Sequence, residues 1–196
     1  MRRLLTFVLL ALTLGAGAAH AGDVGVGVSL FGGLSWPVLQ EVNVSSFSPS
    51  DAFGESGSQF GIRVPVKAIP VVLLEPYYSS TSYGDRTETF NGLQYSRDGY
   101  DATAFGLNAI LGSIDGGTLK FYPYVGFGST NLKREGEDFS ETGFTFGLGL
   151  GISPAEKISI QVRSEFAMLP TGDTSRKFGS LTLGLNYNLL PGKGQE

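Results

Sequence analysis

The stretch at residues 180–189 alternates between two kinds of side chain. Because successive side chains of a strand point to opposite sides, each kind occupies one face. One face is apolar: Leu181, Leu183, Leu185, Tyr187 and Leu189. The other is small and polar: Ser180, Thr182, Gly184, Asn186 and Asn188. A sheet in water would carry Lys and Glu on its outer face, so this pattern predicts a cramped, wet interior and a face turned to lipid.

The same period of two recurs in seven earlier stretches, at residues 23–31, 57–67, 71–80, 101–111, 119–129, 141–152 and 157–168. The connections alternate in length: long at 32–56, 79–101, 130–140 and 169–177, short at 68–70, 113–117 and 153–156. Asn91-Gly92 is a strong hairpin signal within the second long connection, so we expect a hairpin that projects beyond the membrane. The sequence therefore predicts an all-β fold, an eight-stranded antiparallel up-and-down transmembrane β-barrel.

The N-terminus has the pattern of an export signal. Arg2 and Arg3 precede an apolar run at residues 4–14, and Ala19-His20-Ala21 matches the small, any, small pattern of a cleavage site. The alternative, a membrane anchor, needs about 20 apolar residues, and this run is too short. We expect a cleaved signal peptide at 1–21, the barrel at 22–190 and a short periplasmic tail at 191–196.

Composition limits the chemistry of the mature chain. The single histidine, His20, leaves with the signal peptide, and the chain has no cysteine. This removes the Ser-His and Cys-His nucleophile arrangements and nearly all ordinary zinc sites, so we expect no catalytic residue, no cofactor and no metal. Loss of Arg2 and Arg3 lowers Lys plus Arg from 14 to 12 against 18 Asp plus Glu, a net charge of −6, which disfavours nucleic-acid binding.

Charged side chains fall on the predicted interior face: Arg63, Lys67, Glu75, Lys120, Glu141, Arg163 and Glu165. We interpret them as an ion-pair network that fills a barrel too narrow for a water channel; the alternatives are a solute pathway or a catalytic cluster. The turn centres predict facing pairs across neighbouring strands: Arg63–Glu75, Tyr122–Asn108, Tyr124–Gly106, Arg163–Gly147 and Glu165–Thr145.

Four residues of the last strand, Thr182, Gly184, Tyr187 and Leu189, resemble the C-terminal signal of bacterial outer-membrane β-barrels, although the chain continues for seven residues beyond it. With the stretch 123–128, they make the chain resemble the small barrels of Gram-negative bacteria typified by the OmpA transmembrane domain and OmpX. The resemblance implies insertion by the barrel assembly machinery into the cell outer membrane and contact with its lipids and lipopolysaccharide. We expect a monomer.

The leading functional hypothesis is a non-enzymatic outer-membrane protein with a packed polar interior, acting in a structural or surface-interaction role through its extracellular loops. A narrow solute or ion channel is the alternative, and a lipid-modifying enzyme ranks below it because such barrels rely on histidine. A soluble ligand-binding barrel is the rival fold. Loop aromatic residues would contact a partner or cover the barrel mouth: Trp36, Phe47, Phe53, Phe90 and Tyr95. Loop acids would hold divalent cations or simply be exposed: Glu135, Glu137 and Asp138.

Overall fold

The computed structural model describes residues 25–38, 56–69, 72–90, 93–97, 99–112, 119–134, 137–155, 157–171 and 174–190. The signal cleavage site at Ala19 and Ala21 and the tail at 191–196 lie outside these residues. The described strands are β1 (Val26–Val38), β2 (Gly57–Arg63), β3 (Val66–Ile69), β4 (Val72–Tyr83), β5 (Arg86–Phe90), β6 (Leu93–Arg97), β7 (Tyr100–Leu111), β8 (Lys120–Arg134), β9 (Glu137–Ala155), β10 (Ile158–Thr171) and β11 (Thr174–Leu190). No helix in this part of the chain is long and apolar enough to cross a membrane.

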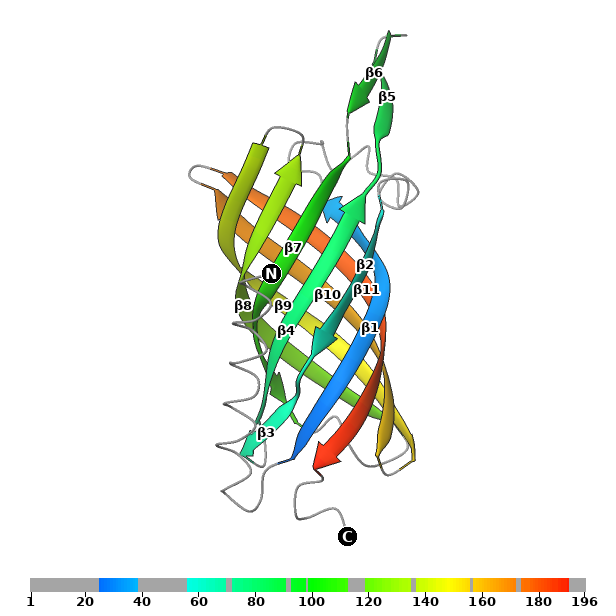
Figure 1. Ribbon diagram of the computed structural model, residues 1–196, viewed down its shortest axis with the longest axis vertical. Coiled ribbons are helices and arrows are strands. Elements are labelled where there is room, and N and C mark those ends of the chain that lie inside the picture. Colours follow the sequence, from blue (N-terminus) through cyan, green and yellow to red (C-terminus); the bar gives the residue numbers. More distant parts are fainter. Residues whose placement is uncertain are drawn as a thin grey trace.

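Nine of these strands form one antiparallel sheet, and β11 pairs back onto β1, so the sheet closes into a barrel (Figure 1). β2 and β3 are two parts of one barrel strand, interrupted at Val64-Pro65. Proline has no N–H to donate to the ladder, which explains the break. Pairing resumes around it, since Gly27 N donates to the Pro65 carbonyl at 2.9 Å. The barrel therefore has eight strands, and the predicted fold is confirmed.

The outer face is the apolar one. Its side chains are 44 to 63% exposed at Phe121, Val125, Phe127, Phe144, Phe146, Leu148, Leu150, Ile152, Leu181, Leu183, Leu185 and Leu189. On β9 the outward apolar residues run from Phe144 to Pro154, which spans about 25 Å along the barrel axis at a rise of about 3.3 Å per residue and a tilt of about 40°. This height matches the hydrocarbon band of an outer membrane.

In the stretches 57–67 and 71–80, the alternation of side chains predicts that Val64, Val66 and Pro76 face lipid. All three are instead buried. Val64 and Val66 pack with Val26 in a small apolar cluster beside the interrupted strand. The Val64 N–H also donates to the carbonyl of Pro76 at 2.9 Å, so β4 stays paired with the segment that joins β2 and β3. The prediction of lipid exposure for these residues is wrong, although the alternation on either side of them holds.

At one end of the barrel the strands continue well past the apolar band, and we call this the hairpin end. The predicted hairpin is confirmed: β5 and β6 pair from Arg86↔Arg97 to Phe90↔Leu93 and project beyond the barrel (Figure 1). The opposite end, where β1 begins and β11 finishes, is the terminal end.

Strands extend into three of the predicted long connections and make up most of two of them, 130–140 and 169–177. β1 continues to Val38, the β8–β9 ladder reaches Arg134↔Glu137, and the β10–β11 ladder reaches Thr171↔Thr174. The β8–β9 and β10–β11 ladders keep a single register throughout, so hydrogen bonding extends through polar residues whose composition resembles a loop. The acidic residues illustrate this: Asp138 is an exposed strand residue, while Glu135 and the side chain of Glu137 lie outside the described residues.

The five predicted facing pairs are wrong. Arg63 faces Tyr77, Asn108 faces Gly126, Ile110 faces Tyr124, Arg163 faces Gly149 and Glu165 faces Gly147. Each register is displaced by two or four positions from the prediction, because the turns are not centred where the sequence suggested. An even displacement leaves every side chain on its original face, so the assignment of interior and exterior survives.

Candidate functional site

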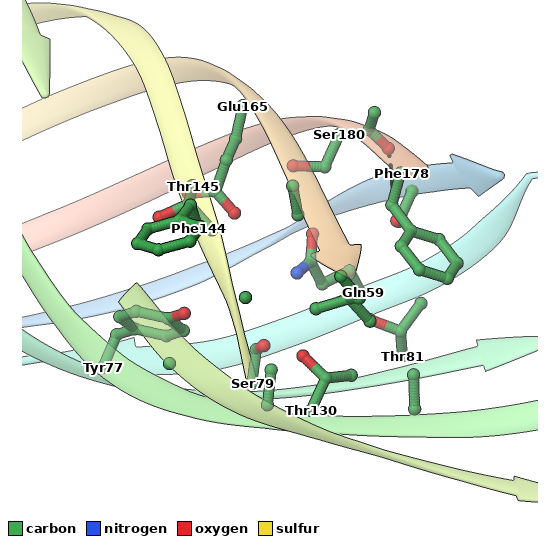
Figure 2. A pocket seen from close by; sticks show the side chains of 18 of the residues that line it. Gln59, Tyr77, Ser79, Thr81, Thr130, Phe144, Thr145, Glu165, Phe178 and Ser180 are labelled. Atoms are coloured by element: carbon green, nitrogen blue, oxygen red, sulfur yellow. Dashed lines mark hydrogen bonds between the residues drawn. The ribbon is translucent and has the colours of Figure 1, made fainter. Parts of the chain in front are cut away.

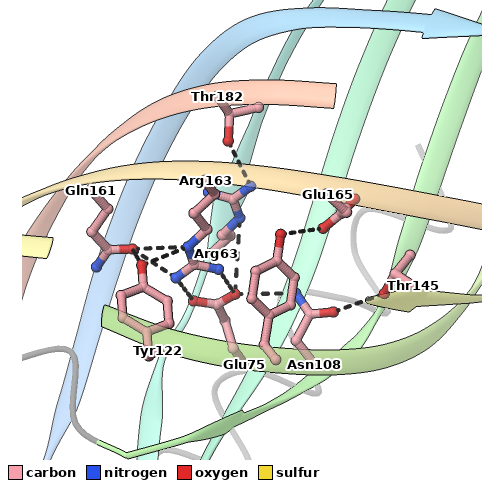
Figure 3. A network of polar contacts seen from close by, with 10 residues as sticks. Arg63, Glu75, Asn108, Tyr122, Thr145, Gln161, Arg163, Glu165 and Thr182 are labelled. Carbon is pink, nitrogen blue, oxygen red and sulfur yellow. Dashed lines mark hydrogen bonds and ion pairs between the residues drawn. The ribbon is translucent and has the colours of Figure 1, made fainter. Parts of the chain in front are cut away.

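The centre of the lumen holds a buried ion pair between β10 and β4. Arg163 Nη1 donates to Glu75 Oε1 at 2.5 Å and Arg163 Nη2 donates to Glu75 Oε2 at 2.7 Å, a bidentate arrangement (Figure 3). The two residues are 1% and 0% exposed. They lie on strands that are not neighbours in the sheet, so the pair spans the lumen and ties opposite walls together.

Arg63 completes what we call the central charge cluster, Arg63, Glu75 and Arg163. Its Nε lies 3.9 Å from Glu75 Oε1, and its Nη2 donates to Thr182 Oγ1 at 3.2 Å. The guanidinium carbon lies 3.6 Å from the ring centroid of Phe31, a cation–π contact. Arg63 is therefore held mainly by the ring of Phe31 and the hydroxyl of Thr182. Its distance to Glu75 is longer than the distance between Arg163 and Glu75.

Neutral side chains satisfy the remaining hydrogen bonds around Arg163 and Glu75. The Arg163 Nε donates to the Tyr122 hydroxyl at 3.0 Å, and its Nη2 donates to Gln161 Oε1 at 2.7 Å. Asn108 Nδ2 donates to Glu75 Oε1 at 3.2 Å and is itself fixed by the Thr145 hydroxyl (Figure 3). A buried charge pair is tolerated where such partners are present.

Glycines on β9 make room for the tyrosines of β8. A Cβ added at Gly147 would lie 2.5 Å from the Tyr124 ring, and one at Gly149 would collide with the Tyr122 ring. Close approach of these rings to the β9 backbone places the two hydroxyls at the charged groups. The Tyr124 hydroxyl donates to Glu165 Oε2 at 3.0 Å.

The structure brings together Arg63, Glu75 and Arg163 from the predicted network, and Glu165 joins through Tyr124. Lys67 and Lys120 lie toward the terminal end, where Lys67 pairs with Leu73 and Lys120 with Gly151. Glu141 lies toward the hairpin end, opposite Thr130. Sequence analysis did not assign to the ion-pair network five residues that surround the central charge cluster: Phe31, Asn108, Tyr122, Thr145 and Gln161. All five lie on the interior faces of their strands, so the alternation of side chains along each strand could have indicated them.

A small cavity of about 60 Å³ lies between this cluster and the hairpin end (Figure 2). Its wall is rich in hydroxyl groups, and Glu165 contributes a carboxylate. The polar residues that line it include Ser35, Gln59, Ser79, Thr81, Thr130, Thr145 and Ser180. We call it the upper chamber.

Two aromatic side chains, Tyr83 and Phe178, line the upper chamber on the side of the hairpin end. Tyr83 stacks on Tyr100 with ring centroids 4.5 Å apart, and Phe178 lies 6.2 Å from Tyr83. The Tyr83 and Ser35 hydroxyls share a hydrogen bond of 2.7 Å. Tyr83 lies past the apolar band, beside the exposed Ser82 and Asp101, and burial raises the pKa of its hydroxyl above the ordinary value.

Trp36 was predicted in a loop, either contacting a partner or covering the mouth. It lies instead in β1 opposite Gly179, and a Cβ on Gly179 would be 2.5 Å from its Nε1, so the indole covers the outward side of that glycine. Phe47 and Phe53 lie outside the described residues, as do the side chains of Phe90 and Tyr95.

The residues that resemble an assembly signal divide between the two faces of β11. Thr182 and Gly184 point into the lumen, while Tyr187 and Leu189 are 48% and 53% exposed on the outer face. Among the described residues, no group of three acidic, histidine or cysteine side chains could hold a metal ion. The arrangement supports a rigid, hydrogen-bonded core.

Comparison with known proteins identifies the fold. The chain matches the family model of the outer membrane protein beta-barrel domain over residues 6–188. No curated protein matches. OprG from Pseudomonas aeruginosa is a similar solved structure, with 13% identity, coverage of 86% of this chain and 98% of that chain, and a TM-score of 0.54. Neisserial surface protein A is also similar, with 13% identity, coverage of 84% of this chain and 96% of that chain, and a TM-score of 0.53. Ail of Yersinia pestis, in complex with the heparin analogue sucrose octasulfate, is similar at 15% identity, with coverage of 85% of this chain and 99% of that chain and a TM-score of 0.51.

These structures share the closed barrel seen here, and at such low identity the likeness concerns the fold alone. The family match covers nearly the whole chain and accounts for the apolar outer band, the polar lumen and the closed sheet. The chain belongs to the outer-membrane β-barrel protein family and resides in the outer membrane.

Proposed function

We propose that the protein is a non-enzymatic surface protein whose barrel serves as a rigid anchor and whose binding surface is the hairpin end. One observation carries this proposal: the strands and the β5–β6 hairpin continue past the lipid-facing band, while the lumen beneath them is filled by the central charge cluster. A filled lumen leaves the projecting surface as the part available to a partner.

The hairpin end faces the outside of the cell in this proposal. Outer-membrane barrels have short periplasmic turns and longer extracellular loops, and both described ends of the barrel chain lie at the opposite end. The exposed apolar band then contacts lipid and, in the outer leaflet, lipopolysaccharide. Insertion uses the barrel assembly machinery through Thr182, Gly184, Tyr187 and Leu189, and the protein acts as a monomer.

A surface role agrees with one structural relative. Ail is described as an attachment invasion locus protein and was solved with a heparin analogue. The net charge is −4 for the full sequence and −6 without Arg2 and Arg3 of the signal peptide, which disfavours a strongly sulfated partner. We therefore propose that this protein also acts in attachment, but we do not propose that it binds a sulfated ligand.

The proposal is tested by shortening the hairpin. Replacing residues 85–98 with Asn-Gly joins Gly84 to Gly99 next to the Tyr83↔Tyr100 pair, which is the last pair of the barrel ladder. Bacteria that display the shortened chain should bind less well to host-cell monolayers and matrix proteins, while the protein still migrates as a heat-modifiable band from outer membranes. Glu75→Asp, which alters the lumen and leaves the hairpin intact, is the control. Unchanged binding by the shortened chain would contradict the proposal.

A narrow channel is the competing function, and the upper chamber is the observation in its favour. The bidentate Arg163–Glu75 pair opposes it, because a solute would have to separate two buried charges. Planar-bilayer recording decides: we expect no resolvable current from the wild type. A steady current altered by Glu75→Gln would favour the channel, and phospholipase-like turnover by the purified protein would refute the non-enzymatic reading.

A further inference from the structure

The upper chamber lies on the hairpin side of the central charge cluster, and each of the eight barrel strands contributes to its wall (Figure 2). A water-sized sphere needs about 10–15 Å³ of such space, so a cavity of about 60 Å³ admits a ligand of a few non-hydrogen atoms. Small inward residues of β7 to β10 leave this space open: Ala102, Ala104, Gly128, Gly143 and Ala167.

Among the described residues that line the chamber, Glu165 alone carries a charge. The two arginines nearby belong to the central charge cluster, where Arg163 donates to Glu75 and Arg63 donates to Thr182. A ligand in the chamber therefore meets a carboxylate first, and this disfavours an anion.

Gln59 brings an unpaired acceptor to the same wall. It lies on β2 opposite Thr81, and its Oε1 is buried without a hydrogen-bond partner within the protein (Figure 2). Buried polar atoms are almost always paired, and an amide oxygen can only accept. The oxygen therefore indicates a ligand that donates.

The hydrogen bonds of two tyrosines leave further acceptors at the chamber. Ser35 Oγ donates to the Gly179 carbonyl at 3.2 Å, so Tyr83 must be the donor in its 2.7 Å bond to Ser35. The Tyr83 oxygen then retains only its capacity to accept. The Tyr124 hydroxyl donates to Glu165, whose carboxylate can accept additional bonds. The protein's own donors are thus used up where these acceptors remain.

The remaining wall selects among donors. Ala104, Leu169 and Phe178 give part of it an apolar surface, which suits a short alkyl group and not a bare metal ion. The rings of Phe178 and Tyr83 are also of the kind that attracts an organic cation. An alkylammonium ion combines three N–H donors, a positive charge and an apolar chain.

We propose that the upper chamber binds a small primary ammonium ion, which is attracted by Glu165 and donates to unpaired acceptors such as Gln59 Oε1. The ion enters from the hairpin end, because the bidentate Arg163–Glu75 pair fills the lumen on the other side. This site lies inside the barrel and does not depend on what the projecting surface binds.

Three probes test the charge selection: ethanolamine, ethylene glycol and glycolate share a two-carbon frame and are cationic, neutral and anionic. Each is titrated at constant ionic strength into the intact protein in phosphatidylcholine nanodiscs. Ethanolamine should shift the NMR signal of the Gln59 side-chain amide saturably and leave that of Asn188, at the terminal end, in place. Absence of this shift would overturn the proposal, as would an equal shift with either other probe or with sodium ion.

Two variants locate the site. Glu165→Gln removes the charge and should raise the Kd for ethanolamine about tenfold or more. Glu141→Gln is the matched control, since it removes the same charge from the inward face of β9 outside the chamber wall, and its Kd should equal that of the wild type. An unchanged Kd in Glu165→Gln would overturn the proposal.

Gln59→Leu keeps every charge of the lumen, so it serves even if Glu165→Gln fails to fold. It removes one acceptor and should raise the Kd about threefold to tenfold, measured on the backbone amide of Ser180 in the chamber wall. A Kd equal to that of the wild type would show that ethanolamine binds elsewhere, and the proposal would fail.

Discussion

Glu75 is the anion that both buried arginines of the lumen approach, at 2.5 Å from Arg163 and 3.9 Å from Arg63. Removing its charge leaves Arg163 buried without a counter-ion. We expect Glu75→Gln to lower the free energy of unfolding by about 3–5 kcal/mol, the range for breaking one side of a buried pair. Urea unfolding of the refolded protein, followed by the fluorescence of its single tryptophan, measures the change.

Glu141→Gln is the control for this substitution, since Glu141 lies toward the hairpin end and is partly exposed. Its effect should stay within about 0.5 kcal/mol. If Glu75→Gln and Glu141→Gln lowered the free energy of unfolding equally, the net charge of the protein, and not the central charge cluster, would determine stability.

A second residue-scale prediction concerns the glycine beneath Tyr122. The Tyr122 ring packs on the backbone of Gly149 and its hydroxyl is held by Arg163, so the ring cannot move aside without losing that bond. Gly149→Ala should destabilise the barrel by about 1–3 kcal/mol, as overpacking does. Gly84→Ala is the matched control, because a Cβ there has nothing within 4 Å. The same urea assay applies, and a neutral Gly149→Ala would show that the lumen is loosely packed.

At the scale of the element, β11 offers a test of membrane depth along a single strand. Leu185 is 56% exposed near the middle of the outward row, and Leu189 is 53% exposed near its end. Leu185→Arg should cost about 2–4 kcal/mol and Leu189→Arg about 0–1 kcal/mol, since the penalty for a cation falls from the bilayer midplane to the interface.

Refolding into phospholipid vesicles with urea titration gives both values. Similar exposure of the two leucines makes the comparison fair, because packing within the protein then contributes little to the difference. Equal costs would place the lipid boundary elsewhere on β11.

Over the whole molecule, the sequence predicted well which side chains face the lumen and which face outward, but it predicted the register between neighbouring strands poorly. The alternation within β9 and β11 is local, and the alternating apolar residues at 144–152 and 181–189 lie outside as expected. The register depends on where each turn is centred, and sequence does not determine that to within two residues.

The partner of Glu75 was harder to foresee. Arg63 was expected because it lies on the adjacent barrel strand, whereas the main partner, Arg163, lies on β10 across the lumen. That contact exists only once the sheet closes. Likewise, the polar ends of β8 to β11 resemble loops in composition, and only the uninterrupted ladders show them to be strands.

On the scale of the whole chain, the proposed recognition by the barrel assembly machinery can be tested separately from stability. Tyr187 and Leu189 point outward, so truncating them exchanges one lipid contact for another and should cost little folding free energy. If they form the signal read by the assembly machinery, the double variant Tyr187→Ala, Leu189→Ala should lose its heat-modifiable band from outer membranes in cells, yet refold in detergent with the wild-type urea midpoint.

Leu181→Ala with Leu183→Ala is the matched control on the same face of β11, and it should insert normally. Failure of both double variants in cells would indicate that apolar exposure along β11 is what matters. Failure of the Tyr187 and Leu189 variant in detergent as well would assign these residues to stability, because a defect that persists without the assembly machinery cannot arise from recognition.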